Sequence, residues 1–209
     1  MFMEELIMSD VVAVTNRHLC VGDYFEQIEA VAASGVNKLI VREKDLTPQE
    51  YKELFVRVRD ICGTYHVEAV PHYFWREASQ CGADAIHLPL DVLEECCDKP
   101  EFIQAHFTTI GTSVHSVEQA EKACRLGASY VTAGHVFATD CKKGLEPRGL
   151  GFLKNICRIC APKGVQVYAI GGISPDNYRS ALDAGAAAVC MMSYMMKARY
   201  GQNVCRKED

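Results

Sequence analysis

Short apolar runs rich in β-branched residues recur along the chain, and a longer amphipathic stretch follows each of them. Runs of this kind predict buried strands, and the longer stretches have the spacing of helices with one apolar face. The predicted strands span residues 11–15, 37–42, 67–71, 83–88, 108–112, 129–134, 165–170 and 186–192. The predicted helices span residues 24–34, 47–63, 75–80, 116–126 and 151–160, with a less regular stretch at 91–106 and further helices after residues 177 and 192.

Two of the predicted helices begin with a capping sequence. Thr47 can accept a hydrogen bond from the first helical turn, Pro48 is tolerated in that turn, and Glu50 completes a capping box. Residues 174–177, with the sequence Ser-Pro-Asp-Asn, are predicted to cap the helix after the seventh strand. Both signals place a helix start shortly after a predicted strand.

The alternation of strands and helices indicates a parallel sheet, because each crossover helix returns the chain to the same end of the sheet. Helices on both faces explain why the strands are continuously apolar. Eight such units favour closure into a (β/α)8 barrel, the TIM-barrel form of the α/β class, and an open doubly wound sheet is the alternative. Neither a linker nor a low-complexity segment interrupts the pattern, so residues 1–209 are predicted to form a single domain.

The charge balance is mildly acidic, with 22 Lys and Arg against 27 Asp and Glu and a net charge of −5. This balance argues against bulk binding of nucleic acid, which requires a basic face. No apolar run reaches the roughly 18 residues that a membrane span needs. The acidic N-terminal segment lacks the basic region of a secretory signal. We therefore expect no nucleic-acid or membrane partner and a cytoplasmic location.

Eleven cysteines are scattered through the predicted helices and strands. Without an export signal, this distribution is typical of reduced thiols in a cytosol. Cys157 and Cys160 form a Cys-x-x-Cys pair, which a redox or zinc site would also use. No second Cys or His pair stands at zinc-finger spacing and the pair falls within a predicted helix, so we expect ordinary helix residues and leave the role of the pair open.

In a barrel of this kind the active site lies at the carboxyl ends of the strands. The residues at or just after the predicted strand ends are Asn16, Arg17, Arg42, Lys44, His72, His87, Ser113, His115, His135, Gly171, Gly172 and Ser193. Packing readily explains one histidine, but it does not explain four histidines and three basic residues around one mouth. The set predicts a binding site for an anionic small molecule.

Glycines and small residues mark the ends of the last two strands. Gly171 and Gly172 follow the seventh strand, and Met192 and Ser193 end the eighth. Glycine lets the backbone approach a ligand closely, and N–H groups at helix starts bind anions. Phosphate sites after strands seven and eight recur in this architecture. We predict that these four residues bind a phosphate; the simpler interpretation of the glycine pair is a tight turn.

Several segments resemble the thiamine-phosphate-synthase/TenI superfamily, in the same order and over nearly the whole chain. They are residues 41–45 (VREKD), 86–88 (IHL), 110–116 (IGTSVHS), 134–144 (GHVFATDCKKG) and 169–173 (AIGGI). Residues 134–144 are the most specific segment and resemble TenI closely. Synthases usually carry a proline after the first glycine of this segment and a threonine-rich run before its lysine.

The chain departs from the synthase pattern where that pattern binds metal and pyrophosphate. Ile40 stands where a glutamine is expected, and His72 and Tyr73 replace an asparagine–aspartate pair. A further aspartate is expected at Val92, although Asp91 is adjacent. Displacement of pyrophosphate needs Mg2+, which prefers carboxylate oxygens. These departures favour TenI over a synthase.

The resemblance to TenI implies a thiazole tautomerase. Such an enzyme converts the dihydro, exocyclic-alkene tautomer of carboxythiazole phosphate into the aromatic thiazole by a proton shift. The resemblance implies His135 as the acid–base residue. It also implies substrate contacts from Arg42, Lys44, Lys142 and Ser113. We expect no metal and no other cofactor, and a small thiazole phosphate as the partner.

Two other functions remain open. A thiamine phosphate synthase would join a pyrimidine pyrophosphate to thiazole phosphate and would require Mg2+. A catalytically silent barrel would bind a thiamine-related ligand, regulate another process and tolerate the loss of His135. The sequence does not fix the oligomeric state, for which a homodimer is one option, or the roles of His72, His87 and His115.

Overall fold

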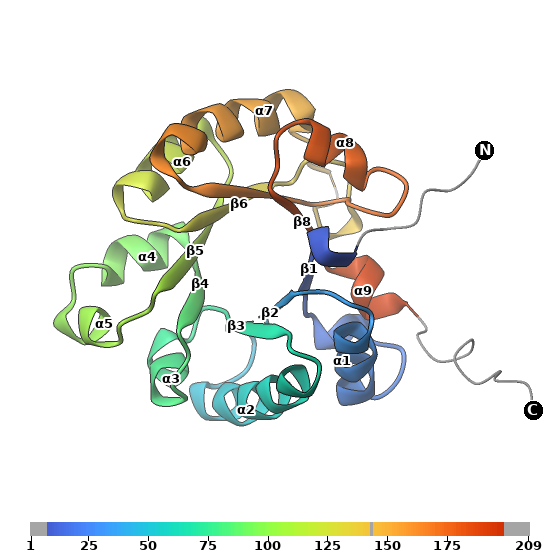
Figure 1. Ribbon diagram of the computed structural model, residues 1–209, viewed down its shortest axis with the longest axis vertical. Coiled ribbons are helices and arrows are strands. Elements are labelled where there is room, and N and C mark those ends of the chain that lie inside the picture. Colours follow the sequence, from blue (N-terminus) through green and yellow to red (C-terminus); the bar gives the residue numbers. More distant parts are fainter. Residues whose placement is uncertain (1–7, 143, 199–209) are drawn as a thin grey trace, which may run out of the picture.

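Eight parallel strands form a barrel with helices around its outside (Figure 1). The computed structural model describes residues 8–142 and 144–198. The strands are β1 (Val11–Val14), β2 (Lys38–Val41), β3 (Glu68–Pro71), β4 (Ala85–Pro89), β5 (Thr109–Val114), β6 (Tyr130–Gly134), β7 (Gln166–Ile170) and β8 (Ala188–Met191). Their order in the sheet is β3-β2-β1-β8-β7-β6-β5-β4, so the first strand pairs with the last.

The seam between β3 and β4 is joined at its carboxyl end. His72 and His87 form an isolated parallel bridge, and the N–H of Tyr73 donates to the carbonyl of His87 at 3.0 Å. The two ends of the strand order therefore meet. The predicted (β/α)8 barrel is confirmed, and the doubly wound alternative is wrong. The predicted domain covers residues 1–209, of which 1–7, 143 and 199–209 lie outside the described part of the chain. Most of the acidic N-terminal segment also lies outside it.

Helices of different lengths cover the outside of the barrel (Figure 1). The longer ones are α1 (Tyr24–Ala33), α2 (Pro48–Thr64), α6 (Val117–Arg125) and α7 (Gly149–Cys160). The shorter ones are α3 (Trp75–Gln80), α4 (Leu90–Cys96), α5 (Pro100–Gln104), α8 (Tyr178–Asp183) and α9 (Ser193–Lys197), with 3-10 turns at Met8–Asp10, Arg17–Leu19, Asp140–Lys142 and Ala161–Lys163. The less regular stretch 91–106 thus contains the short helices α4 and α5. In the described ranges, no helix is long and apolar enough to cross a membrane.

The two capping predictions have different outcomes. At α2, Thr47 and Glu50 form the expected capping box, in which the Thr47 N–H donates to Glu50 at 2.9 Å. At α8, the Asn177 side chain makes no capping bond to the helix. It instead accepts from the Ser174 N–H at 2.9 Å and donates to the Gly172 carbonyl at 2.8 Å. Asn177 therefore holds the turn after β7, because its amide reaches backward along the chain.

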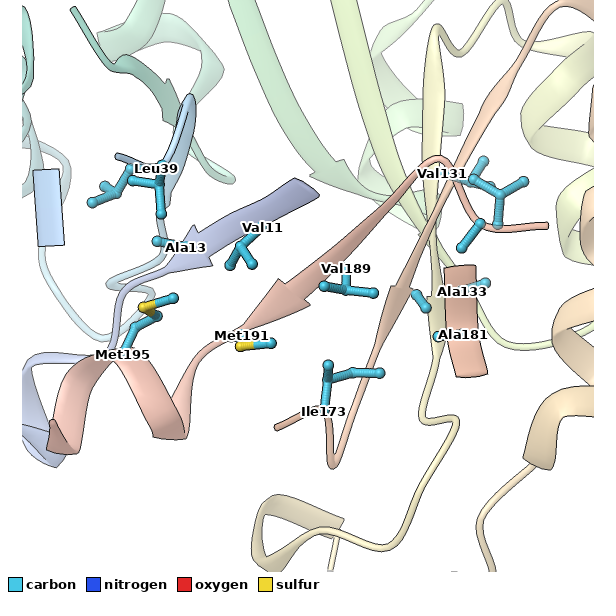
Figure 2. Packing of buried hydrophobic residues seen from close by; sticks show 14 of the residues in the cluster. Val11, Ala13, Leu39, Val131, Ala133, Ile173, Ala181, Val189, Met191 and Met195 are labelled. Carbon is cyan, nitrogen blue, oxygen red and sulfur yellow. The ribbon is translucent and has the colours of Figure 1, made fainter. Parts of the chain in front are cut away.

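Side chains alternate between the inside and the outside of the barrel, as successive residues of a strand point to opposite faces. In β6, Tyr130 packs in the cluster inside the barrel, whereas Val131 and Ala133 pack in the cluster between sheet and helices. Figure 2 shows Val131, Ala133 and Val189 among the outward side chains, near Ala181 of α8. This alternation determines which residues at each strand end face the mouth of the barrel.

Candidate active site

A cavity of about 310 Å3 lies at the carboxyl ends of the strands. Its lining residues are Val14, Arg42, Lys44, His72, Pro89, Ser113, His115, Thr132, Gly134, His135, Thr139, Lys142, Ile170, Gly171, Gly172, Ile173, Cys190, Met192 and Ser193. The structure thus brings all the predicted site residues together around one space: His135, Arg42, Lys44, Ser113, Lys142, Gly171, Gly172, Met192 and Ser193. Their functional roles remain predictions.

Three cations, the basic wall, line the cavity. Arg42 and Lys44 follow β2, and Lys142 comes from the loop after β6. Within the described part of the chain, none of the three forms an ion pair. The pKa of Lys44 is lowered, first by burial and then by the charges of Arg42 and Lys142, while Asp91 acts in the opposite direction. An anionic ligand would relieve this mutual repulsion.

A second part of the lining, the glycine wall, is built from backbone that leaves no room for side chains. Gly171 and Gly172 have φ of +99° and +68°, which favours glycine. A Cβ on Gly171 would lie 2.6 Å from the Cα of His135, and a Cβ on Gly172 would lie 2.8 Å from the Cβ of Phe137. The helix α8 begins only at Tyr178. The backbone at the cavity is therefore the glycine turn and not the first turn of that helix.

His135 follows β6 immediately and packs against the glycine turn. Its side chain is 8% exposed and lines the cavity. Its Nε2 lies 3.4 Å from the carbonyl oxygen of Leu145, a long separation for a hydrogen bond. The backbone is held more firmly, because the His135 carbonyl accepts from the Arg148 N–H at 3.0 Å and the Val136 N–H donates to the Ile170 carbonyl at 2.9 Å. The backbone of His135 is thus held firmly, while the contact between its ring and the Leu145 carbonyl is a long one.

The other three strand-end histidines occupy different environments. His115 lines the cavity, and its Nδ1 lies 2.8 Å from the carbonyl oxygen of Gly134. His72 also lines the cavity, and its buried Nδ1 has no partner among the described residues. His87 lies behind the cavity wall, between Tyr130 and Ser113. Burial lowers the pKa of His87 to about 3 and that of His72 well below its usual value, so both rings are neutral.

Two strand-end residues point away from the cavity. Arg17 forms ion pairs with Asp45 and with the buried Glu43, and Asn16 caps the short turn at Arg17–Leu19. The expectation that Arg17 adds to the basic mouth is therefore wrong. Its charge is neutralised by two carboxylates that follow the neighbouring strand.

Several residues that line the cavity were not among those predicted from the sequence. Thr132 of β6 is the most informative, because its hydroxyl lies 3.0 Å from that of Ser113. It stands two residues before Gly134, on the same face of the strand. The two-residue period of strands would have identified Thr132. It would also have identified Cys190 in β8, which stands two residues before Met192. The predicted residues lie at or just after the strand ends, so residues that lie one layer deeper in the barrel, such as Thr132, were not among them.

Carboxylates are absent from the described lining of this cavity. Asp91 lies with Glu94 in an adjoining depression on the other side of Ser113 and His115, and Val92 lines a third one, outside the barrel. Among the described residues, no group of three or more His, Cys, Asp or Glu could hold a metal ion. Mg2+ beside a pyrophosphate is usually held by one or two carboxylates, and Asp91 and Glu94 in the adjoining depression are carboxylates that border the cavity.

The Cys157–Cys160 pair lies on α7, among residues that do not line the cavity. The Cys160 thiol contacts Cys124 of α6 with 3.8 Å between the sulfur atoms. Burial, together with Cys124, raises the pKa of Cys160 to about 12, so it is a thiol and not a reactive thiolate. The described cysteines are all free. These facts fit ordinary packed residues.

The fold is a (β/α)8 barrel, and the cavity at its strand ends suits a small anionic molecule. The TMP-TENI family, described as thiamine monophosphate synthase, matches residues 11–195. The chain belongs to this family, and the resemblance stated from the sequence is confirmed.

Relatives and solved structures agree with this assignment. The chain is 28% identical over 192 residues to a thiamine-phosphate synthase of Fusobacterium nucleatum, covering 89% of this chain and 88% of the relative. It is 31% identical over 191 residues to a thiamine-phosphate synthase of Haloarcula marismortui, covering 90% of each. The structure of thiamine phosphate pyrophosphorylase from Pyrococcus furiosus is similar, with a TM-score of 0.73, 27% identity and coverage of 92% of this chain and 90% of that one. These names favour the synthase alternative over a tautomerase.

Proposed function

We propose that this protein is a thiazole tautomerase that aromatises carboxythiazole phosphate by a proton shift. One observation carries the proposal: the imidazole of His135, two further histidines, three cations and a glycine turn line one cavity, and the described lining contains no carboxylate. This set of groups can bind an anion and move a proton. The described lining offers no carboxylate of the kind that usually holds Mg2+ in the displacement of pyrophosphate.

The reaction needs one group that accepts and returns a proton. In the substrate tautomer, one ring carbon carries a proton that the aromatic product lacks, and the exocyclic alkene carbon gains one. We propose that His135 removes the first proton and delivers a proton to the second carbon, so that the imidazole ends as it began. An imidazole titrates near neutrality and can serve in both roles. The step is redox-neutral and forms no covalent intermediate.

The two walls of the cavity suit the two anionic ends of this substrate. Gly171, Gly172, Met192 and Ser193 would bind the phosphate. Arg42, Lys44 and Lys142 would meet the carboxylate, with a hydrogen bond from Ser113. A cavity of about 310 Å3 is at the small end for ligand sites, which are usually about 300–1,000 Å3.

Thiamine phosphate synthase is the second candidate, and the names of the relatives favour it. Against it stand His72 and Tyr73 at the positions where the synthase pattern has an asparagine–aspartate pair. In a synthase the basic wall would bind pyrophosphate in place of a carboxylate. The two candidates therefore share most contacts and differ in the need for Mg2+ and in the role of His135.

Two assays on the same preparation separate these functions. In the first, the dihydrothiazole tautomer is incubated with the protein and a chelator, and the aromatic product is followed by ultraviolet absorbance. We expect turnover above the buffer rate. In the second, pyrimidine pyrophosphate and thiazole phosphate are supplied with Mg2+, and we expect no thiamine phosphate. The reverse pattern would establish the synthase, and tight ligand binding without either reaction would indicate a regulatory barrel.

A further inference from the structure

A chain of hydrogen bonds runs from the barrel interior to the wall of the cavity. Tyr130 Oη lies 3.1 Å from His87 Nδ1, and His87 Nε2 lies 3.0 Å from Ser113 Oγ. Thr132 Oγ1 donates to the same Ser113 oxygen at 3.0 Å. These four residues belong to the adjacent strands β4, β5 and β6. Only Ser113 and Thr132 line the cavity, so His87 and Tyr130 act from behind it.

The direction of the chain follows from Tyr130. Its side chain is 1% exposed and packs over Gly111, where a Cβ would collide with the ring. Burial raises the pKa of Tyr130 well above its usual value, so the phenol keeps its proton. Among the described residues, His87 Nδ1 is the recorded hydrogen-bond partner of this hydroxyl. A buried hydroxyl proton needs an acceptor, so Tyr130 donates and Nδ1 accepts.

The proton of the neutral His87 ring must then be on Nε2, where it is donated to Ser113 Oγ. With the bond from Thr132, this oxygen accepts two hydrogen bonds, which occupy both of its lone pairs. Its own proton remains available and is directed to the cavity. We infer that His87, held by Tyr130, is a positioning residue that makes Ser113 a hydrogen-bond donor, and only a donor, toward the ligand.

This arrangement determines what the ligand presents to Ser113. A carboxylate oxygen, an unprotonated ring nitrogen or a hydroxyl oxygen can accept the bond, whereas an N–H group cannot. Sites built to satisfy a polar group of the ligand discriminate strongly against analogues that lack it. Identifying the acceptor as the carboxylate of carboxythiazole phosphate rests on the proposed function. The assignment of the His87 proton to Nε2 does not depend on the proposed function.

The position of that proton can be measured on the ligand-free protein. Nitrogen-15 NMR of the imidazole rings distinguishes a protonated Nε2 from a protonated Nδ1. We expect His87 to be protonated on Nε2 and to keep that form between pH 5 and 9, because burial lowers its pKa to about 3. A His87 ring protonated on Nδ1 would overturn the inference, whatever reaction the enzyme catalyses.

Removing one hydroxyl tests the direction of the chain. Tyr130→Phe deletes the donor to Nδ1 and should allow the other His87 tautomer to appear in the NMR spectrum. Tyr168→Phe is the matched control, since its ring stacks on Tyr130 at 4.6 Å but its hydroxyl bonds to Gln166. We expect the control to leave the His87 signals unchanged. Equal changes in both variants would point to general loosening of the interior and would contradict the inference.

Ligand selectivity provides a second readout. Aromatic carboxythiazole phosphate and the same phosphate without its carboxylate serve as probes in calorimetry. His87→Leu should weaken binding of the carboxylated probe by about 10- to 100-fold, the usual effect of a hydrogen bond to a charged group, and leave the other probe unaffected. His87→Gln, whose amide can still donate to Ser113, should restore most of the selectivity. Equal losses for both probes, or none for either, would overturn the role assigned to His87.

Discussion

The two walls of the cavity are built on different physical principles. The wall of Gly171 and Gly172 is made by backbone packed against His135 and Phe137, with no space for a Cβ. The wall of Arg42, Lys44 and Lys142 is made by long side chains whose charges repel one another. Shape therefore determines the first wall and charge the second. The first should respond sharply to a single methyl group, and the second should respond gradually to each lost charge.

The largest effect is expected from Gly171→Ala. Its methyl group would collide with His135, and its positive φ strains any other residue. We expect the free energy of unfolding to fall by about 2–4 kcal/mol, from overpacking and backbone strain together, and tautomerase turnover to be lost. Gly151→Ala is the control, because nothing lies within 4 Å of a Cβ there and α7 should gain slightly. Denaturant unfolding measures the stability of both variants, and the ultraviolet assay measures their turnover. A fully active and stable Gly171→Ala variant would refute the shape argument.

His135→Ala removes the proposed acid–base group without disturbing either wall. We expect kcat to fall by about 10- to 1,000-fold, toward the lower part of the usual range for acid–base catalysis, because aromatisation makes the step downhill. The exposed His66, replaced by Asn to suit its positive φ, is the control. Unchanged kcat in His135→Ala would mean that the cavity acts by binding alone.

A single charge removed from the basic wall should have a smaller effect. Arg42→Gln is expected to raise KM about tenfold with little change in kcat, since the lost bond to an anion is partly replaced by the remaining cations. The surface residue Lys154→Gln on α7 should leave KM unchanged. If Arg42→Gln lowered kcat and left KM unchanged, Arg42 would act on the transition state and not on binding.

The pH dependence of binding should be the mildest effect. The pKa of Lys44 is lowered by burial and by its cationic neighbours, so the ammonium loses its proton at a lower pH than a free lysine. The charge that attracts the anion is present below this pKa and disappears as the pH rises through it. Affinity for carboxythiazole phosphate should therefore decline with rising pH before the ordinary lysine range. Lys44→Arg should extend the plateau; an identical profile in that variant would assign the decline to another group.

Strand periodicity predicted the barrel, and the strand-end rule predicted many of the residues around its mouth but not the deeper ones such as Thr132 and Cys190. Both depend on short-range geometry that the sequence carries directly. Arg17 was misplaced because its position depends on Asp45 and Glu43, which belong to a neighbouring strand end. Whether a charge is free or paired is decided by tertiary contacts, and the linear pattern does not contain them.

The same limit applies to the histidines and to Asn177. His87 and His135 both follow the strand-end pattern, yet one lies behind the wall and the other lines the cavity. In His87 the side chain belongs to the strand itself and points into the barrel, whereas His135 is the first residue beyond β6. Asn177 is a residue type that often caps helices, but its side chain donates to Gly172 in the preceding glycine turn. The orientation of such side chains depends on competing hydrogen-bond partners, which only the folded chain brings together.

The central claim is that His135 moves a proton on an anion-anchored ring without a metal. The most direct measurement is the rate of appearance of aromatic carboxythiazole phosphate from its dihydro tautomer in the presence of chelator, with wild type and His135→Ala compared at saturating substrate. The account predicts rapid metal-independent turnover by the wild type and a clear loss in the variant. A wild-type rate equal to that of buffer, alongside Mg2+-dependent formation of thiamine phosphate, would contradict it.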